Sequence, residues 1–148
     1  MLQKIKEMCE GIKYSKDIPK EAIQLAKENG IIVILGGSDD LMYCYGADSY
    51  LSDHVEHCEG WDGCDLAKDA SDDELKKEAE QLGLKIFWCG SIAKTGEKIA
   101  NYDSDKNGAF SYSVKDGIDF VDFKVMEDKD VYCTGIIIKL PEGFKSYA

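Results

Sequence analysis

Apolar residues recur at helical spacing in three segments of the chain. Residues 1–10 form a short lysine-rich amphipathic pattern, and residues 17–29 carry an apolar stripe for which Asp17 can act as the helix cap. The acidic run 71–74 is a capping box, and it predicts a third helix that ends at Gly83. Glycine also follows the other two segments, as is typical of helix ends.

The strand predictions begin with residues 31–35, which are apolar on both faces of an extended chain and therefore indicate a central strand. After a turn, residues 41–45 predict the returning strand of a hairpin. Four further strands are predicted at residues 84–89, 109–114, 120–126 and 131–140. The expected fold is α+β: one antiparallel sheet of about six strands with two or three helices packed on one face. No linker divides the chain, so residues 1–148 are expected to form a single domain.

The charged residues exclude several classes of partner. The chain has 29 acidic residues against 18 basic ones, all of them lysine, which gives a net charge of −11. Nucleic acids and anionic membranes reward a basic surface, so neither is expected as the main partner. No apolar run is long enough for a membrane span and the N-terminus lacks a signal-peptide core, so a cytoplasmic location is expected.

Two polar segments, residues 47–70 and 91–108, are expected to be irregular. The first contains four residues that are good zinc ligands: His54, His57, Cys58 and Cys64. Their spacing does not match a standard finger or ribbon, so a polar surface loop is the favoured interpretation and a small metal-binding module the open alternative. No cofactor is expected.

Three other patterns are weak indicators of chemistry. The run 103–108 matches the first half of a calcium loop, but Val114 stands where the bidentate glutamate is needed. The glycine pair 36–37 follows a strand without the helix that a phosphate loop requires. Cys89 ends a predicted strand, yet nothing nearby marks a catalytic cysteine. The sequence therefore does not predict an enzyme.

Aromatic residues are concentrated in the predicted C-terminal strands. The simplest interpretation is that they are core residues, because sheet aromatics are usually buried. They are Trp88, Phe110, Tyr112 and Phe120. Aromatic rings at a sheet surface or subunit interface can instead sandwich a purine. Hydroxyls close by in the pattern, such as that of Thr134, could then donate to phosphates.

Several segments resemble a family of small phage proteins. They are residues 28–33, 37–42 with the following Gly46-Ala47, residues 86–89, and much of the stretch from Phe110 to Ile136, and they are spread over the span 28–136. On these segments the chain resembles the first type of Thoeris anti-defence sponge.

The resemblance implies a concrete function. Such sponges are made by phages in the infected bacterial cell, where they bind a cyclic ADP-ribose isomer made by a TIR-domain protein and hide it without cleaving it. Members form homodimers or larger homo-oligomers with pockets at subunit interfaces, and some also take cyclic oligonucleotides. The ligand-binding positions that the resemblance and the aromatic pattern together suggest are Trp88, Phe110, Tyr112, Asp119, Phe120 and Thr134.

The chain departs from the family pattern at four of these six positions. The family has tryptophan where Tyr112 stands, a Pro-His pair at Asp119-Phe120, and arginine at Thr134. A different way of binding phosphate, or a different ligand, is therefore expected.

The high acidic charge leaves another hypothesis open, an acidic inhibitor that mimics DNA and binds a host nuclease. Lysines interleaved with the acids weigh against it, because no long acidic stripe forms.

Overall fold

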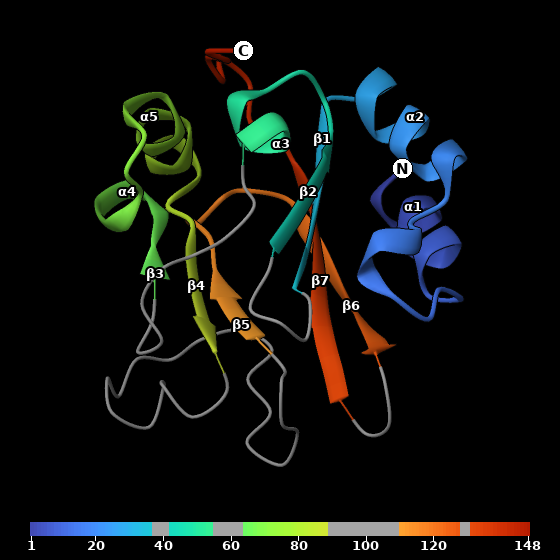
Figure 1. Cartoon of the computed structure of the whole chain (residues 1–148). Helices are drawn as coiled ribbons and strands as arrows, with labels where there is room; N and C mark the ends of the chain where they lie inside the picture. Colours follow the sequence, from blue (N-terminus) through green and yellow to red (C-terminus); the bar gives the residue numbers. More distant parts are fainter. Residues whose placement is uncertain (37–41, 55–63, 89–109, 128–130) are drawn as a thin grey trace.

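The computed structural model describes residues 1–36, 42–54, 64–88, 110–127 and 131–148 (Figure 1). Its helices are α1 (Leu2–Cys9), the 3-10 turn η1 (Ser15–Asp17), α2 (Lys20–Glu28), α3 (Tyr50–His54), α4 (Leu66–Asp69) and α5 (Asp73–Leu82). Its strands are β1 (Ile31–Gly36), β2 (Met42–Gly46), β3 (Cys64–Asp65), β4 (Lys85–Trp88), β5 (Phe110–Ser113), β6 (Phe120–Glu127) and β7 (Val131–Lys139).

The larger sheet has four antiparallel strands in the order β2-β1-β7-β6. Strand β1 lies in its interior, with Ile34 opposite Cys44 of β2 on one side and opposite Ile136 of β7 on the other. Alternate residues of β1 enter two different hydrophobic clusters, one on each face of the sheet. The prediction of a central strand with two buried faces is confirmed.

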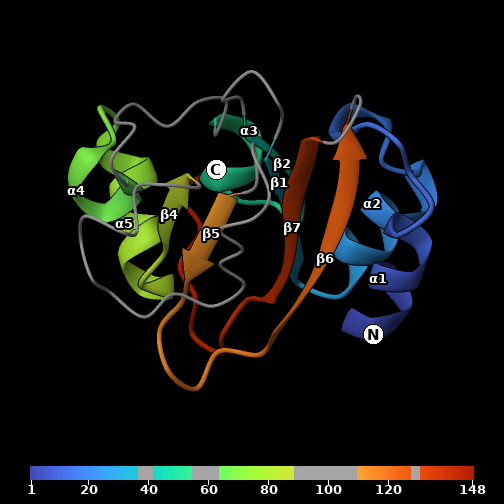
Figure 2. The same ribbon diagram turned by 90° about the horizontal axis from the view of Figure 1, so that it is seen from below.

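Helices α1 and α2 cover one face of this sheet (Figures 1 and 2). The buried residues between them and the sheet are Ile5, Cys9, Ile18, Ala22, Ala26, Ile31, Val33, Leu35, Phe123 and Ile137. Helix α2 begins after Pro19, which is in the extended conformation, whereas Asp17 lies in the preceding turn η1. The helix was therefore predicted in the right place but with the wrong cap.

The opposite face is covered by α3, α4, α5 and a second sheet of three antiparallel strands, in the order β3-β4-β5 (Figure 2). The core on this side comprises Ile32, Ile34, Cys44, Ala47, Leu51, Leu66, Leu75, Ala79, Leu82, Leu84, Tyr112, Ile136 and Ile138. The described residues thus form three layers, with the larger sheet in the middle.

The α+β class and the antiparallel pairing are confirmed, but the single sheet of about six strands is not. The described strands fall into two sheets, and helices pack on both sides of the larger one rather than on one face. The physical reason is that this sheet is apolar on both faces, so both need a cover. The connection between β5 and β6 crosses from one sheet to the other, held by Lys115 N donating to Leu82 O at 2.7 Å.

The segment 47–70 was predicted to be irregular, but its described part contains α3, β3 and α4. The segment 91–108, with the calcium-like run 103–108, lies outside the described residues, as does Cys89. No helix in the described ranges is long and apolar enough to cross a membrane.

Candidate functional site

The six predicted ligand-binding residues are distributed over both sheets. Trp88 and Phe110 are backbone partners where β4 and β5 pair, and Tyr112 lies further along β5 opposite Ile86. On the larger sheet, Phe120 begins β6 directly after Asp119, and Thr134 of β7 is the backbone partner of Lys124. Among the side chains of these six residues, the described contacts join those of Tyr112 and Phe120.

Tyr112 links the two sheets through its side chain. The ring is fully buried, and its hydroxyl donates to Oδ2 of Asp122 on β6 at 2.8 Å. Burial, and then the bond to the Asp122 carboxylate, raise the pKa of Tyr112 well above its usual range, so the phenol stays protonated and donates. Its buried position makes Tyr112 a support for neighbouring groups rather than an open binding surface.

Phe120 is the exposed member of this cluster. Its side chain is 36% exposed, and its ring meets the Tyr112 ring edge to face, with centroids 5.6 Å apart and planes at 89°. This geometry is favourable for aromatic pairs and fixes the orientation of the outer ring. Asp119 is exposed beside it, and its backbone carbonyl accepts from Lys139 N at 2.9 Å. Together Phe120, Tyr112 and Asp122 form what we call the β6 aromatic cluster.

Asp122 was missed by the reasoning from sequence. The available signal was strand alternation, which places residues 120 and 122 on the same face of β6. An acidic residue among apolar strand positions indicates a buried partner, but 29 acidic residues in the chain obscure that indication.

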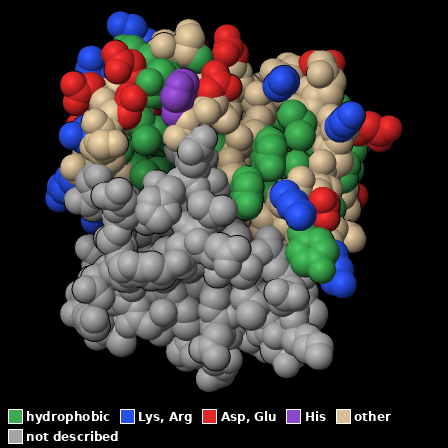
Figure 3. All heavy atoms as spheres, viewed as in Figure 1, with side chains coloured by type: hydrophobic (Ala, Val, Ile, Leu, Met, Phe, Trp, Pro, Cys, Tyr) green, Lys and Arg blue, Asp and Glu red, His purple; other side chains and the backbone are tan. Residues whose placement is uncertain are grey.

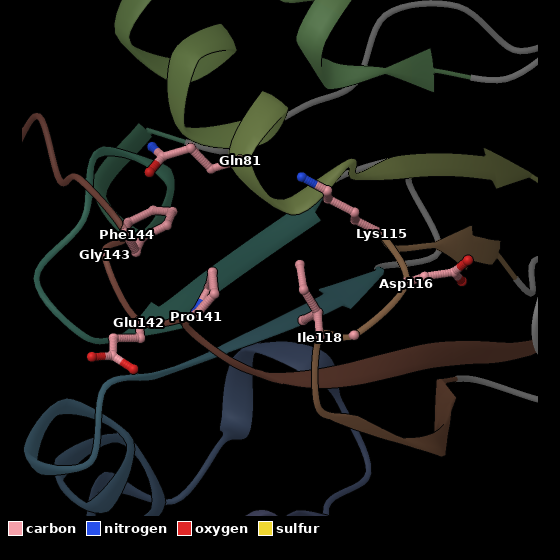
Figure 4. A pocket seen from close by; sticks show the side chains of 9 residues that line it. Gln81, Lys115, Asp116, Ile118, Pro141, Glu142, Gly143 and Phe144 are labelled. Atoms are coloured by element: carbon pink, nitrogen blue, oxygen red, sulfur yellow. The ribbon is translucent and has the colours of Figure 1, made fainter.

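A cavity of about 350 Å³ lies where the β5–β6 connection approaches the C-terminal segment (Figure 4). Two tight turns face it: Ile118 N donates to Lys115 O at 3.3 Å, and Phe144 N donates to Pro141 O at 3.0 Å. The remaining lining residues are Gln81 at the end of α5, Asp116, Gly117, Glu142 and Gly143. Sequence reasoning did not identify this cavity, since its walls come from three separate parts of the chain.

The charged side chains around the cavity point in different directions. In Figure 4 the Lys115 side chain extends toward the end of α5, whereas the carboxylates of Asp116 and Glu142 point away from the cavity. Ile118 and Phe144 are half-buried and pack on the core. The cavity therefore offers an apolar floor, one ammonium group and exposed glycine backbone.

The C-terminal wall of the cavity is attached to α5 by side chains. The Gln81 amide accepts from Lys145 N at 2.7 Å and donates to Lys145 O at 3.0 Å. One turn earlier, the fully buried Glu78 carboxylate accepts from Tyr147 N at 2.7 Å. The same carboxylate accepts from Tyr50 N at 2.9 Å and Leu51 N at 2.8 Å, so it also binds the start of α3.

The four candidate zinc ligands are only partly placed. His54 ends α3, where its ring stacks on the Tyr50 ring with centroids 3.7 Å apart. Cys64 of β3 is the backbone partner of Ile86 of β4. His57 and Cys58 lie outside the described residues. The residues that the structure describes contain no cluster of three or more potential metal ligands. The metal-site alternative stays a prediction.

Cys9 and Cys44 are buried in the core. Burial raises the pKa of Cys9 to about 11 and raises that of Cys44 further, with additional contributions from Glu78 and Asp53. Both thiols are therefore protonated and poor nucleophiles at neutral pH.

The described residues thus provide two separate features: a fixed, exposed aromatic ring at the start of β6, and a cavity with one lysine on the connection that precedes that strand. Such groups can stack on a base and attract an anion. Comparisons of the chain with protein-family models, with curated proteins and with solved structures find no match.

Proposed function

We propose that the protein binds and sequesters a cyclic ADP-ribose-type signal without cleaving it, and so acts as a phage anti-defence protein against Thoeris immunity. It would act in the cytoplasm of the infected cell, as a homodimer or larger homo-oligomer, without a cofactor. The observation that carries the proposal is the exposed ring of Phe120, held edge-on by the buried Tyr112–Asp122 pair.

The aromatic cluster supports recognition of a purine. Base stacking on an aromatic side chain contributes about 1–3 kcal/mol, and a ring whose orientation is already fixed loses little entropy on binding. Phe120 is one of two exposed large hydrophobic residues in the described ranges, and Tyr112 and Asp122 fix it from within. A purine face would cover it.

The phosphates of such a signal need a cation, and the chain has no arginine. Lys115 is exposed and lines the cavity five residues before Phe120, and it forms no salt bridge with the residues described. The carboxylates of Asp116 and Glu142 point away from the cavity, so local repulsion is reduced although the chain carries −11 overall (Figure 4). We assign the phosphate-facing role to Lys115.

The surface charge favours a small-molecule partner over a DNA-mimic role. On the face that Figure 3 shows, lysine and acidic side chains of the described residues are interspersed rather than separated. A nucleic-acid mimic requires a continuous row of negative charge to replace the phosphate backbone.

Titration calorimetry with a panel of cyclic ADP-ribose isomers tests the proposal. The expected result is tight binding of one isomer, and heating the complex should release that isomer with unchanged mass. The Phe120→Ala variant should bind at least about fivefold more weakly, because it loses a stacking surface. Tyr14→Ala removes a half-buried aromatic residue before η1 and should bind like the unmodified protein. Absence of binding at micromolar protein, or recovery of a cleaved product, would refute sequestration.

A further inference from the structure

Strand β6 ends the larger sheet. It is eight residues long and pairs with β7, and no described strand lies along its other side. At its start Phe120 is exposed, and Val121 and Asp122 are half-buried. An edge strand of this length presents a row of free N–H and C=O groups, which is a template for pairing with another strand.

The opposite edge of the sheet differs. Strand β2 is only five residues long. Helices pack against both edge strands, α2 and α3 against β2 and α1 against β6, so length is what distinguishes the two edges. Natural proteins usually protect a long edge with proline, a bulge or a cover. Residues 120–127 contain no proline, and β6 is paired with β7 in unbroken register from Phe120 opposite Ile138 to Glu127 opposite Val131. The longer edge is therefore the one suited to pairing.

We propose that β6 pairs antiparallel with β6 of a second copy of the chain, centred on Phe123, so that the two four-stranded sheets become one continuous sheet. This inference rests on the sheet edge and the charges along it. It stands independently of the proposed nucleotide ligand.

The charges along β6 select the register. In such a pair each face of one sheet continues the same face of the other, so the centre must fall on a residue. A centre at Asp122 would place Asp122 opposite itself, and a centre at Lys124 would place Lys124 opposite itself. A centre at Phe123 places Asp122 opposite Lys124 twice and Val121 opposite Val125 twice. Opposite charges across a strand pair are favourable and like charges are unfavourable.

The Asp122 carboxylate is already held in a position that suits this contact. The Tyr112 hydroxyl donates to Oδ2, which fixes the carboxylate at the sheet edge. Within the described ranges no donor is found for Oδ1, so this oxygen can accept from a lysine of the second copy. The same register places Phe120 opposite Met126 of the other copy, a combination in which sulfur and an aromatic ring attract.

The first test uses the unmodified protein without nucleotide. Equal amounts of normal and nitrogen-15 protein are mixed and treated with a carbodiimide, which joins carboxylates to lysines in contact. Mass spectrometry should find a peptide pair with mixed isotopes that joins Asp122 to Lys124. A sedimentation experiment should show a dimer. The proposal would be overturned by a monomer at all concentrations up to about 100 micromolar, which is high enough to detect even a weak dimer. Cross-links found only within one copy would also overturn it.

The second test reverses one charge. Lys124→Glu places like charges opposite each other at both contacts, so the dimer dissociation constant should rise by roughly tenfold or more. Lys20→Glu makes the same change at an exposed position on α2 and should leave dimerisation unchanged. Circular dichroism confirms that each variant folds. A Lys124→Glu dimer as tight as the unmodified one would contradict the register. Loss of the dimer with nucleotide binding retained would separate this interface from the proposed function.

Discussion

Gly135 lies within β7, where the space for a β-carbon is already filled. A Cβ built there would lie 2.4 Å from Cζ of Phe123 and 2.7 Å from Cδ2 of Leu35. Gly135→Ala should therefore lower the free energy of unfolding by about 1–3 kcal/mol, the usual cost of overpacking a core. Urea denaturation measures the change. Gly11→Ala, where nothing lies within 4 Å, should shift it by less than about 0.5 kcal/mol.

The buried Tyr112 hydroxyl makes stability depend on alkaline pH. Its pKa is raised above the ordinary value of 10.0 by burial and by the bond to Asp122. Above that pH the unfolded chain loses the proton and the folded protein keeps it, so the free energy of unfolding falls as pH rises.

Tyr112→Phe isolates this effect. At pH 7 it should lower the free energy of unfolding by about 1.5–3 kcal/mol, since a hydrogen bond to a charged acceptor is lost. Above pH 10 the unmodified protein should lose up to about 1.4 kcal/mol per pH unit more than the variant. Urea denaturation of both proteins between pH 7 and pH 11 measures the difference. Parallel curves throughout that range would show that Tyr112 titrates alike in the folded and unfolded states.

At the residue level, the sequence could identify strand aromatics but not their roles. Phe120 was recognised as an aromatic residue of a predicted strand, yet its contact with Tyr112 joins strands of different sheets. Phe123 and Gly135 are backbone partners across β6 and β7, so the need for glycine is visible only once the register is known.

Among the elements, α5 organises its neighbours through one buried carboxylate. Glu78 accepts backbone N–H groups from Tyr50 and Leu51 at the start of α3 and from Tyr147 in the C-terminal segment. These three N–H donors, together with the positive end of the α3 dipole, compensate for the free-energy cost of burying the Glu78 charge. This carboxylate adds to the side-chain cap of α3, in which the Ser49 hydroxyl accepts from Ser52 N at 3.1 Å.

Glu78→Gln should lower the free energy of unfolding by about 2–3 kcal/mol. The amide keeps one acceptor oxygen and turns its NH₂ group toward backbone donors, which leaves a buried N–H without a partner. Glu80→Gln makes the same change at an exposed position of α5 and should have little effect. Denaturation gives the energies, and faster exchange of the Leu51 and Tyr147 amides should accompany Glu78→Gln. Equal effects of the two variants would contradict the role of Glu78.

Long periodic elements were predictable and short ones were not. Helices α1, α2 and α5 have a full apolar stripe, and α5 ends at Gly83 with φ +59°, as a glycine stop predicts. Helices α3 and α4 span five and four residues, too few to show a period, and tertiary contacts such as those of Glu78 support α3. Local sequence carries no signal for such support.

For the whole molecule, strand order required information that local patterns lack. Six strand segments could be recognised, but the division into two sheets depends on where the chain crosses after β5. That crossing is fixed by bonds between distant residues, Lys115 with Leu82 and Lys139 with Asp119. The same crossing creates the cavity and brings Phe120 to the sheet edge, so the proposed site was only partly visible in the sequence.

The overall charge makes a kinetic prediction for the proposed nucleotide. A chain of net charge −11 repels an approaching phosphate over a distance set by salt, about 30 Å at 0.01 M and about 8 Å at 0.15 M. Dissociation depends mainly on local contacts such as Phe120 and Lys115, which are screened less. Stopped-flow association should therefore become faster, by roughly twofold to tenfold, as salt rises through this range. Glu21→Lys, an exposed charge reversal on α2, should speed association at low salt and make the association rate depend less on salt concentration. Association that slows as salt rises would mean that a positive local potential at Lys115 outweighs the charge of the whole molecule.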